Sequence, residues 1–168
     1  MKNTFNKIEK MKIKYLILIV LMLPLTLTSC LKSDLEDLPE FDLKDIVGVQ
    51  RVEYRYVSDE VSPVDGEKVV KFVTLSHSTT IDDTTNKVTL QVSVPAASEN
   101  FSETERNNVS KSNIAVMVSI STAAIIKPVG DAPLLGVPGD WSAPNSYTVW
   151  AADGTSKNWT IEVENLSL

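Results

Sequence analysis

The fold is decided by residues 145–163, which read NSYTVWAADGTSKNWTIEV. Two arms with alternating side chains, 146–151 and 158–163, flank a turn in which Asp153 and Gly154 favour positive φ. A period of two places alternate side chains on one face of a strand. The alternation predicts these core-facing residues: Tyr147, Val149 and Ala151 in the first arm, and Trp159, Ile161 and Val163 in the second. The stretch therefore predicts a β-hairpin with a large aromatic residue in the core.

The same period recurs upstream of this hairpin. Further strands are predicted over 52–56, 69–75, 88–94 and 114–120, each rich in β-branched or aromatic residues. Turn-rich pieces separate them, and no long stretch has helical spacing. Residues 129–145 hold three prolines and three glycines, which predict a loop crossing between sheets or following an edge. Six or seven short strands with turns between them predict an all-β fold, a single immunoglobulin-like β-sandwich of about seven strands.

The N-terminus predicts export. The first fourteen residues carry five lysines against one glutamate, and an uncharged run follows from Tyr15 to Ser29. A basic flank before a short apolar run is typical of a secretory signal peptide. A spanning helix needs about 20 apolar residues, and this run is shorter and contains Pro24. A retained signal anchor is the alternative interpretation.

The end of this run resembles a bacterial lipobox, formed by Leu27, Thr28, Ser29 and Cys30. In signals of that family the peptide is cut before the cysteine, which receives a covalent lipid. Cys30 is the single cysteine of the chain, so an intramolecular disulfide is excluded. Stable anchoring takes more than one acyl chain, since each buried CH₂ contributes only about 0.8 kcal/mol. The predicted division is a lipoprotein signal peptide over 1–29, a lipidated tether over 30–46 and the β-domain over 47–168.

The predicted tether is acidic. Residues 31–46 hold six carboxylates against two lysines, a composition typical of a solvated linker. The residues Ser33, Asp34, Glu36 and Asp37 resemble the export signal of Bacteroidota surface lipoproteins. That resemblance implies an outer-membrane protein that faces the cell exterior.

The hairpin itself resembles the C-terminal hairpin of immunoglobulin-like modules in Bacteroidota surface lipoproteins. Two upstream pieces fit the same pattern: Ile81-Asp82-Asp83 before the strand at 88–94, and Asp140-Trp141-Ser142-Ala143-Pro144 before the hairpin. Such lipoproteins often accompany starch-utilisation-type importers, in which a TonB-dependent barrel and a lid lipoprotein take up glycans or peptides. The resemblance therefore implies a β-sandwich, an anchor in the outer membrane and those two proteins as partners. It implies no reaction.

Charge and composition exclude several function classes. The chain has 22 acidic and 16 basic residues, and removing five lysines and one glutamate with the signal peptide takes the net charge from −6 to −10. An acidic surface argues against nucleic acid as a partner, which needs clustered Lys and Arg. His77 is the single histidine, and its polar neighbours predict an exposed loop position. We therefore predict no catalytic residues, no metal site, and no cofactor apart from the covalent lipid on Cys30.

Trp150 is the candidate contact for a ligand or partner. It falls with Thr148 on the hairpin face opposite the core set, and an outward indole can stack on a sugar ring or anchor a protein. The alternative is that the 129–145 loop covers it. Trp141 is expected to plug an edge of the sandwich, and Tyr54 and Tyr56 are expected in the core.

The sequence thus predicts a non-catalytic cell-surface lipoprotein, an accessory subunit of an outer-membrane system that imports glycan or peptide. The first alternative is a structural or adhesive module that binds protein partners. A small glycoside-active enzyme ranks last, because carboxylates are too common on this surface to mark a catalytic pair.

Overall fold

The computed structural model describes residues 41–168, which form seven strands and one short helix. The elements are β1 (Ile46–Val61), β2 (Lys68–Asp82), β3 (Lys87–Ser93), α2 (Glu103–Asn108), β4 (Ile114–Ile120), β5 (Ile125–Pro128), β6 (Asn145–Trp150) and β7 (Ser156–Ser167). The predicted signal peptide, lipobox, Cys30 and export signal lie outside the described residues. Within 41–168, none of the helical structure is long and apolar enough to span a bilayer.

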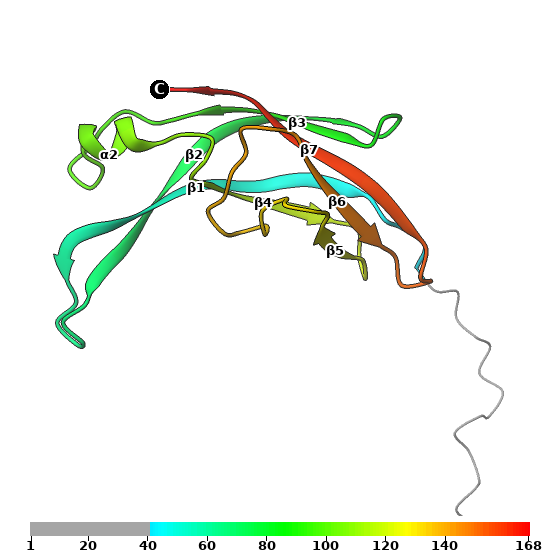
Figure 1. The fold of residues 1–168 in the computed structure, drawn as a ribbon, viewed down its shortest axis with the longest axis horizontal. Coiled ribbons are helices and arrows are strands. Elements are labelled where there is room, and N and C mark those ends of the chain that lie inside the picture. The colour runs from blue at the N-terminus through cyan, green and yellow to red at the C-terminus, as the bar shows by residue number, and fades with distance from the viewer. Residues whose placement is uncertain (1–40) are drawn as a thin grey trace, which may run out of the picture. The chain divides into compact units, whose positions relative to one another are not determined.

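The strands form one mixed sheet in the order β4-β1-β2-β3-β7-β6-β5. Strands β3 and β7 run parallel, and the other neighbouring pairs are antiparallel. The sheet curls strongly into a nearly closed, barrel-like shape (Figure 1). The all-β prediction and the number of strands are therefore confirmed.

The two separate sheets of the predicted sandwich are replaced by this single ladder, because β2 is long enough to pair with two different strands. Its first half pairs with β1, ending at Val52 opposite Leu75, and its second half pairs with β3, beginning at Ser76 opposite Ser93. The backbone of β2 therefore joins the two halves of the domain, with its ladder to β1 ending where its ladder to β3 begins.

The core contains the residue sets that the alternation predicts. Both hairpin sets are buried, and Trp159 and Tyr147 are fully enclosed. The alternating apolar residues of β3 are buried too. Trp141 is fully buried and stacks on Tyr147 with ring centroids 6.1 Å apart.

The last residues of the predicted tether pack on the domain beside the turn between β6 and β7. The carbonyl of Lys44 accepts a hydrogen bond from the indole of Trp159 at 3.1 Å. The Lys157 ammonium lies 2.8 Å from the Asp45 carboxylate, and the Phe41 carbonyl accepts from the amide of Asp153. Residues 41–45 are thus held against the sheet, whereas the sequence predicted a solvated linker up to 46.

A smaller aromatic cluster fills the other end of β1. Tyr54 is buried and stacks on half-buried Tyr56, and both rings contact Phe101. The Ser102 hydroxyl caps α2 by accepting from the amide of Glu105. This turn brings the Glu105 carboxylate to 2.9 Å from the Tyr54 hydroxyl, which donates to it.

Burial, together with the hydrogen bond to Glu105 and its negative charge, raises the pKa of Tyr54 to about 12 from the ordinary 10.0. Stability from this shift is complete below pH 10 and is lost as pH rises through 12. The difference in unfolding free energy between the native chain and Tyr54→Phe is expected to shrink by about 2 kcal/mol between pH 9 and pH 12. Urea unfolding at both pH values measures it, and a difference independent of pH would contradict the assignment.

Candidate functional site

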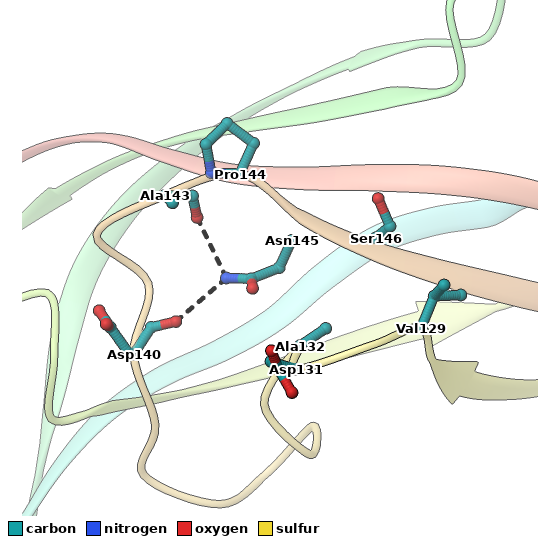
Figure 2. A pocket seen from close by; sticks show the side chains of 8 residues that line it. All are labelled: Val129, Asp131, Ala132, Asp140, Ala143, Pro144, Asn145 and Ser146. Atoms are coloured by element: carbon teal, nitrogen blue, oxygen red, sulfur yellow. Dashed lines mark hydrogen bonds between the residues drawn. The ribbon is translucent and has the colours of Figure 1, made fainter.

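An open pocket lies where the 129–145 loop meets the start of β6 (Figure 2). Its volume is about 400 Å³. The lining residues are Val129, Asp131, Ala132, Asp140, Ala143, Pro144, Asn145 and Ser146. The loop folds tightly around Gly139, where an added Cβ would clash with the ring of Pro133. The amide of Gly139 donates to the Ile114 carbonyl, which fixes this part of the loop along the edge of β4.

The polar groups of the pocket are held in place by the loop backbone. The Asn145 side-chain amide donates to the carbonyls of Asp140 and Ala143, each at 3.1 Å (Figure 2). The Asp140 carboxylate accepts from the amide of Ser142 at 2.9 Å. Hydrogen bonds from the Ser142 side chain and backbone lower the pKa of Asp140. The pocket therefore presents a fixed, ionised carboxylate at neutral pH beside Asp131.

A polar row continues from the pocket along the outer face of the β5–β6–β7 part of the sheet. Ser146, Thr148 and Trp150 alternate with the buried Tyr147 and Val149, so all three face outward. Ser146 also lines the pocket. The four-residue step from Ser146 to Trp150 spans about 13 Å of extended strand. We call this surface, from the pocket to Trp150, the β6 face.

Neighbouring strands complete the β6 face. The Thr148 hydroxyl donates to the Asn158 side-chain oxygen on β7 at 2.8 Å. On β5, the Lys127 ammonium lies 5.8 Å from the centre of the Trp150 ring. Trp150 is half-buried, and its cross-strand partners are Ile125 and Ser156, both outside the 129–145 loop. The β6 face therefore combines a partly exposed indole with fixed hydroxyl, amide and carboxylate groups.

His77 does not lie in a loop, so that prediction is wrong. Strand β2 continues to Asp82, and His77 pairs with Val92 in its middle. The half-buried ring places Nε2 at 3.3 Å from the Val49 carbonyl. His77 also lines a second hollow of about 240 Å³, together with serines and amides of β2, β3 and β7. In residues 41–168 no group of three or more potential metal-ligating side chains comes together.

A family model described as DUF5018-related matches residues 46–162. The chain belongs to the DUF5018-related family.

Two solved structures of Bacteroides proteins are similar to this DUF5018-related chain. It is similar to a predicted secreted protein from Bacteroides fragilis, with 37% identity and a TM-score of 0.70, over 77% of this chain and 100% of that one. It is less similar to a predicted glycoside hydrolase from Bacteroides thetaiotaomicron: 21% identity and a TM-score of 0.42, over 80% of this chain and 28% of that one. The second likeness is too low to inform activity. No curated protein matches the chain.

The sequence singled out Trp150 but missed the pocket at the other end of the β6 face. Asp131, Asp140 and Asn145 are separated by glycines and prolines and have no recognisable spacing. One signal for the pocket was present in the sequence, namely Asp140 followed two residues later by Ser142. This spacing is typical of a short turn in which the aspartate carboxylate accepts a hydrogen bond from the backbone amide of the later residue.

Proposed function

We propose that this DUF5018-related protein is a non-catalytic surface lipoprotein that holds a hydroxyl-rich glycan on its β6 face as an accessory subunit of an outer-membrane import system. The observation that carries the proposal is the continuous row from the half-exposed Trp150 to the carboxylate-lined pocket. A sugar has apolar ring faces and hydroxyl edges. An indole accommodates the first, and the hydroxyl, amide and carboxylate groups beside it accommodate the second.

The location rests on several observations of different kinds. The lipobox at Cys30 and the acidic stretch after it favour export and lipid anchoring. The Bacteroides fragilis relative is a predicted secreted protein. Both favour an extracytoplasmic module.

We propose a non-catalytic role because of the position of the histidine and the pKa of the pocket carboxylate. The one histidine lies half-buried in the middle of a strand. In the pocket, hydrogen bonds from Ser142 lower the pKa of Asp140, whereas a general acid needs a pKa near the working pH. Asp140 is therefore suited to accepting hydrogen bonds from hydroxyl groups rather than to donating a proton.

Replacing Trp150 with alanine is expected to weaken glycan binding at least about fivefold, since stacking on an aromatic ring contributes about 1 kcal/mol or more. Trp150→Phe, which keeps an aromatic face, is the matched control and should retain most of the affinity. A panel of soluble plant and host polysaccharides, tested by affinity electrophoresis and then calorimetry, measures both. The proposal fails if no polysaccharide binds, or if Trp150→Ala binds as tightly as the native chain.

The importer role has a separate readout. Detergent-solubilised outer membranes containing the tagged, lipidated chain should yield a TonB-dependent barrel and its lid lipoprotein in stoichiometric amounts. Recovery of the chain alone would leave glycan capture intact but remove the importer from the proposal. An adhesive module remains the second candidate, favoured by the exposed apolar side chains of Val57 on β1 and of Val70 and Phe72 on β2.

A further inference from the structure

The outer face of the β1–β2 ribbon carries exposed apolar side chains on two adjacent strands. Val57 pairs directly with Val70, and Arg55 pairs with Phe72. Val57, Val70 and Phe72 are 59%, 63% and 59% exposed. Arg51 and Arg55 lie on the same face, on either side of the buried Glu53. We call this surface the Phe72 patch, and it consists of Arg51, Arg55, Val57, Val70 and Phe72. In the described part of the chain this is a contiguous cluster of exposed apolar residues on regular strands, unlike the isolated ones that any surface has.

A buried carboxylate fixes the two arginines of this patch. Glu53 is only 3% exposed, although it points to the outer face between them. Arg51 Nε lies 2.9 Å from Glu53 Oε1, and Arg55 Nε and Nη2 lie 3.1 and 3.0 Å from Oε2. The Arg51 guanidinium also lies 5.9 Å from the centre of the Phe72 ring. Both guanidinium groups are therefore held beside Phe72 before any partner arrives.

The remaining donors of these arginines point to one kind of partner. Each guanidinium has five N–H donors in a planar fork, and Glu53 occupies only part of each fork. Two arginines and one glutamate leave the patch with one net positive charge, while residues 41–168 as a whole hold 17 acidic and 10 basic residues. The patch is thus a locally positive, apolar surface on an acidic domain.

We propose that the Phe72 patch docks a protein partner that presents carboxylates around an apolar contact. Arginine and aromatic side chains that are already ordered lose little entropy on binding, which is typical of the residues that dominate protein interfaces. The partner's carboxylates accept from the unused N–H groups of Arg51 and Arg55, and its apolar residues cover Phe72, Val70 and Val57.

The residues of the patch disfavour other occupants. The aliphatic Val57 and Val70 offer no hydrogen bonds to sugar hydroxyls. Asp59 and Asp65 at the end of the same ribbon are exposed and disfavour an anionic lipid surface. A second copy bound symmetrically through this face would place arginines against arginines, because Glu53 is buried.

Site-specific crosslinking in intact cells tests the proposal. The full-length lipidated chain receives the photocrosslinking residue p-benzoylphenylalanine in place of Val70, or in place of Thr80 as control. Thr80 lies on the same strand, exposed, opposite Thr89 and away from the patch. Position 70 is expected to give one adduct with a different protein, whose crosslinked peptide contains apolar residues flanked by Asp or Glu. Position 80 should not give that adduct.

Two variants of the chain that carries the crosslinking residue at position 70 test whether the adduct depends on the Phe72 patch. Phe72→Ser removes the exposed ring, and the triple change Arg51→Gln, Glu53→Gln and Arg55→Gln removes all three charges without leaving a buried charge unpaired. Each should reduce the adduct at least about fivefold, with a melting temperature close to that of the parent chain as the folding control. An adduct only with a second copy, a crosslinked peptide without carboxylates, no adduct at all, or an adduct unchanged in the triple variant would each overturn the proposal. None of these outcomes bears on glycan binding at Trp150.

Discussion

Replacing Trp159 with alanine is expected to lower the free energy of unfolding by about 4 kcal/mol, the range for a fully buried aromatic residue. Trp159 has no exposed surface and lies opposite Tyr147 in the β6–β7 hairpin. Its indole N–H donates to the Lys44 carbonyl, and the Lys157 ammonium lies 4.7 Å from its ring centre. Truncation therefore leaves a cavity and also removes the hydrogen bond to Lys44, one of the contacts that hold residues 41–45.

Trp150→Ala in the same hairpin is the matched control. Trp150 is half-buried on the opposite face, so its loss is expected to cost less than about 1.5 kcal/mol. Urea unfolding followed by tryptophan fluorescence and circular dichroism measures both variants. Equal losses for Trp159→Ala and Trp150→Ala would show that the assignment of the two faces is wrong.

The second large effect concerns Glu53. Changing both Arg51 and Arg55 to methionine keeps an aliphatic cover over Glu53 but removes its two cations. The carboxylate would then lie 3% exposed without a positive partner, and the expected loss of unfolding free energy is about 3 kcal/mol. Either single change should cost less, because the other arginine still lies within 3.0 Å of Glu53.

A third substitution in the same background distinguishes the buried charge from lost packing. Adding Glu53→Gln to the two methionine changes should restore the unfolding free energy to within about 1 kcal/mol of the native value, because no ionised group then remains buried. Denaturant titration of the native chain, the two single variants, the double variant and the triple variant measures the series. If the triple variant is as unstable as the double variant, the arginines act through packing and not through their charge.

The sequence predicted the strands whose burial is one-sided. Residues 88–94 and the 145–163 hairpin alternate cleanly, because one face is core and the other is solvent. Strand β5 was missed since it has only four residues, two of them Lys127 and Pro128, and is held by its pairing with β6. The second half of β2 was missed for a related reason: Ser76–Thr80 is polar and becomes a strand through its ladder with β3.

The sheet order and the sites were less accessible to sequence reasoning. Nothing local to Lys87–Ser93 indicates a parallel neighbour some seventy residues later in the chain. Trp150 was found because it breaks the alternation with a large outward side chain. Glu53 alternates with the core residues Val52 and Tyr54, but its burial depends on the two arginines paired with it, and alternation carries no such information. The pocket depends on loop geometry, which the period of side chains does not encode.

The position of β7 has a consequence for how the chain acquires its structure. The last strand along the chain lies in the interior of the sheet, between β3 and β6. Until residues 156–167 are available, β3 lacks its parallel partner and the β5–β6 pair has no connection to the rest of the ladder. Such long-range pairing makes folding slow. In a polypeptide that is threaded through a membrane N-terminus first, β3 and the β5–β6 pair would therefore lack these partners until residues 156–167 emerge.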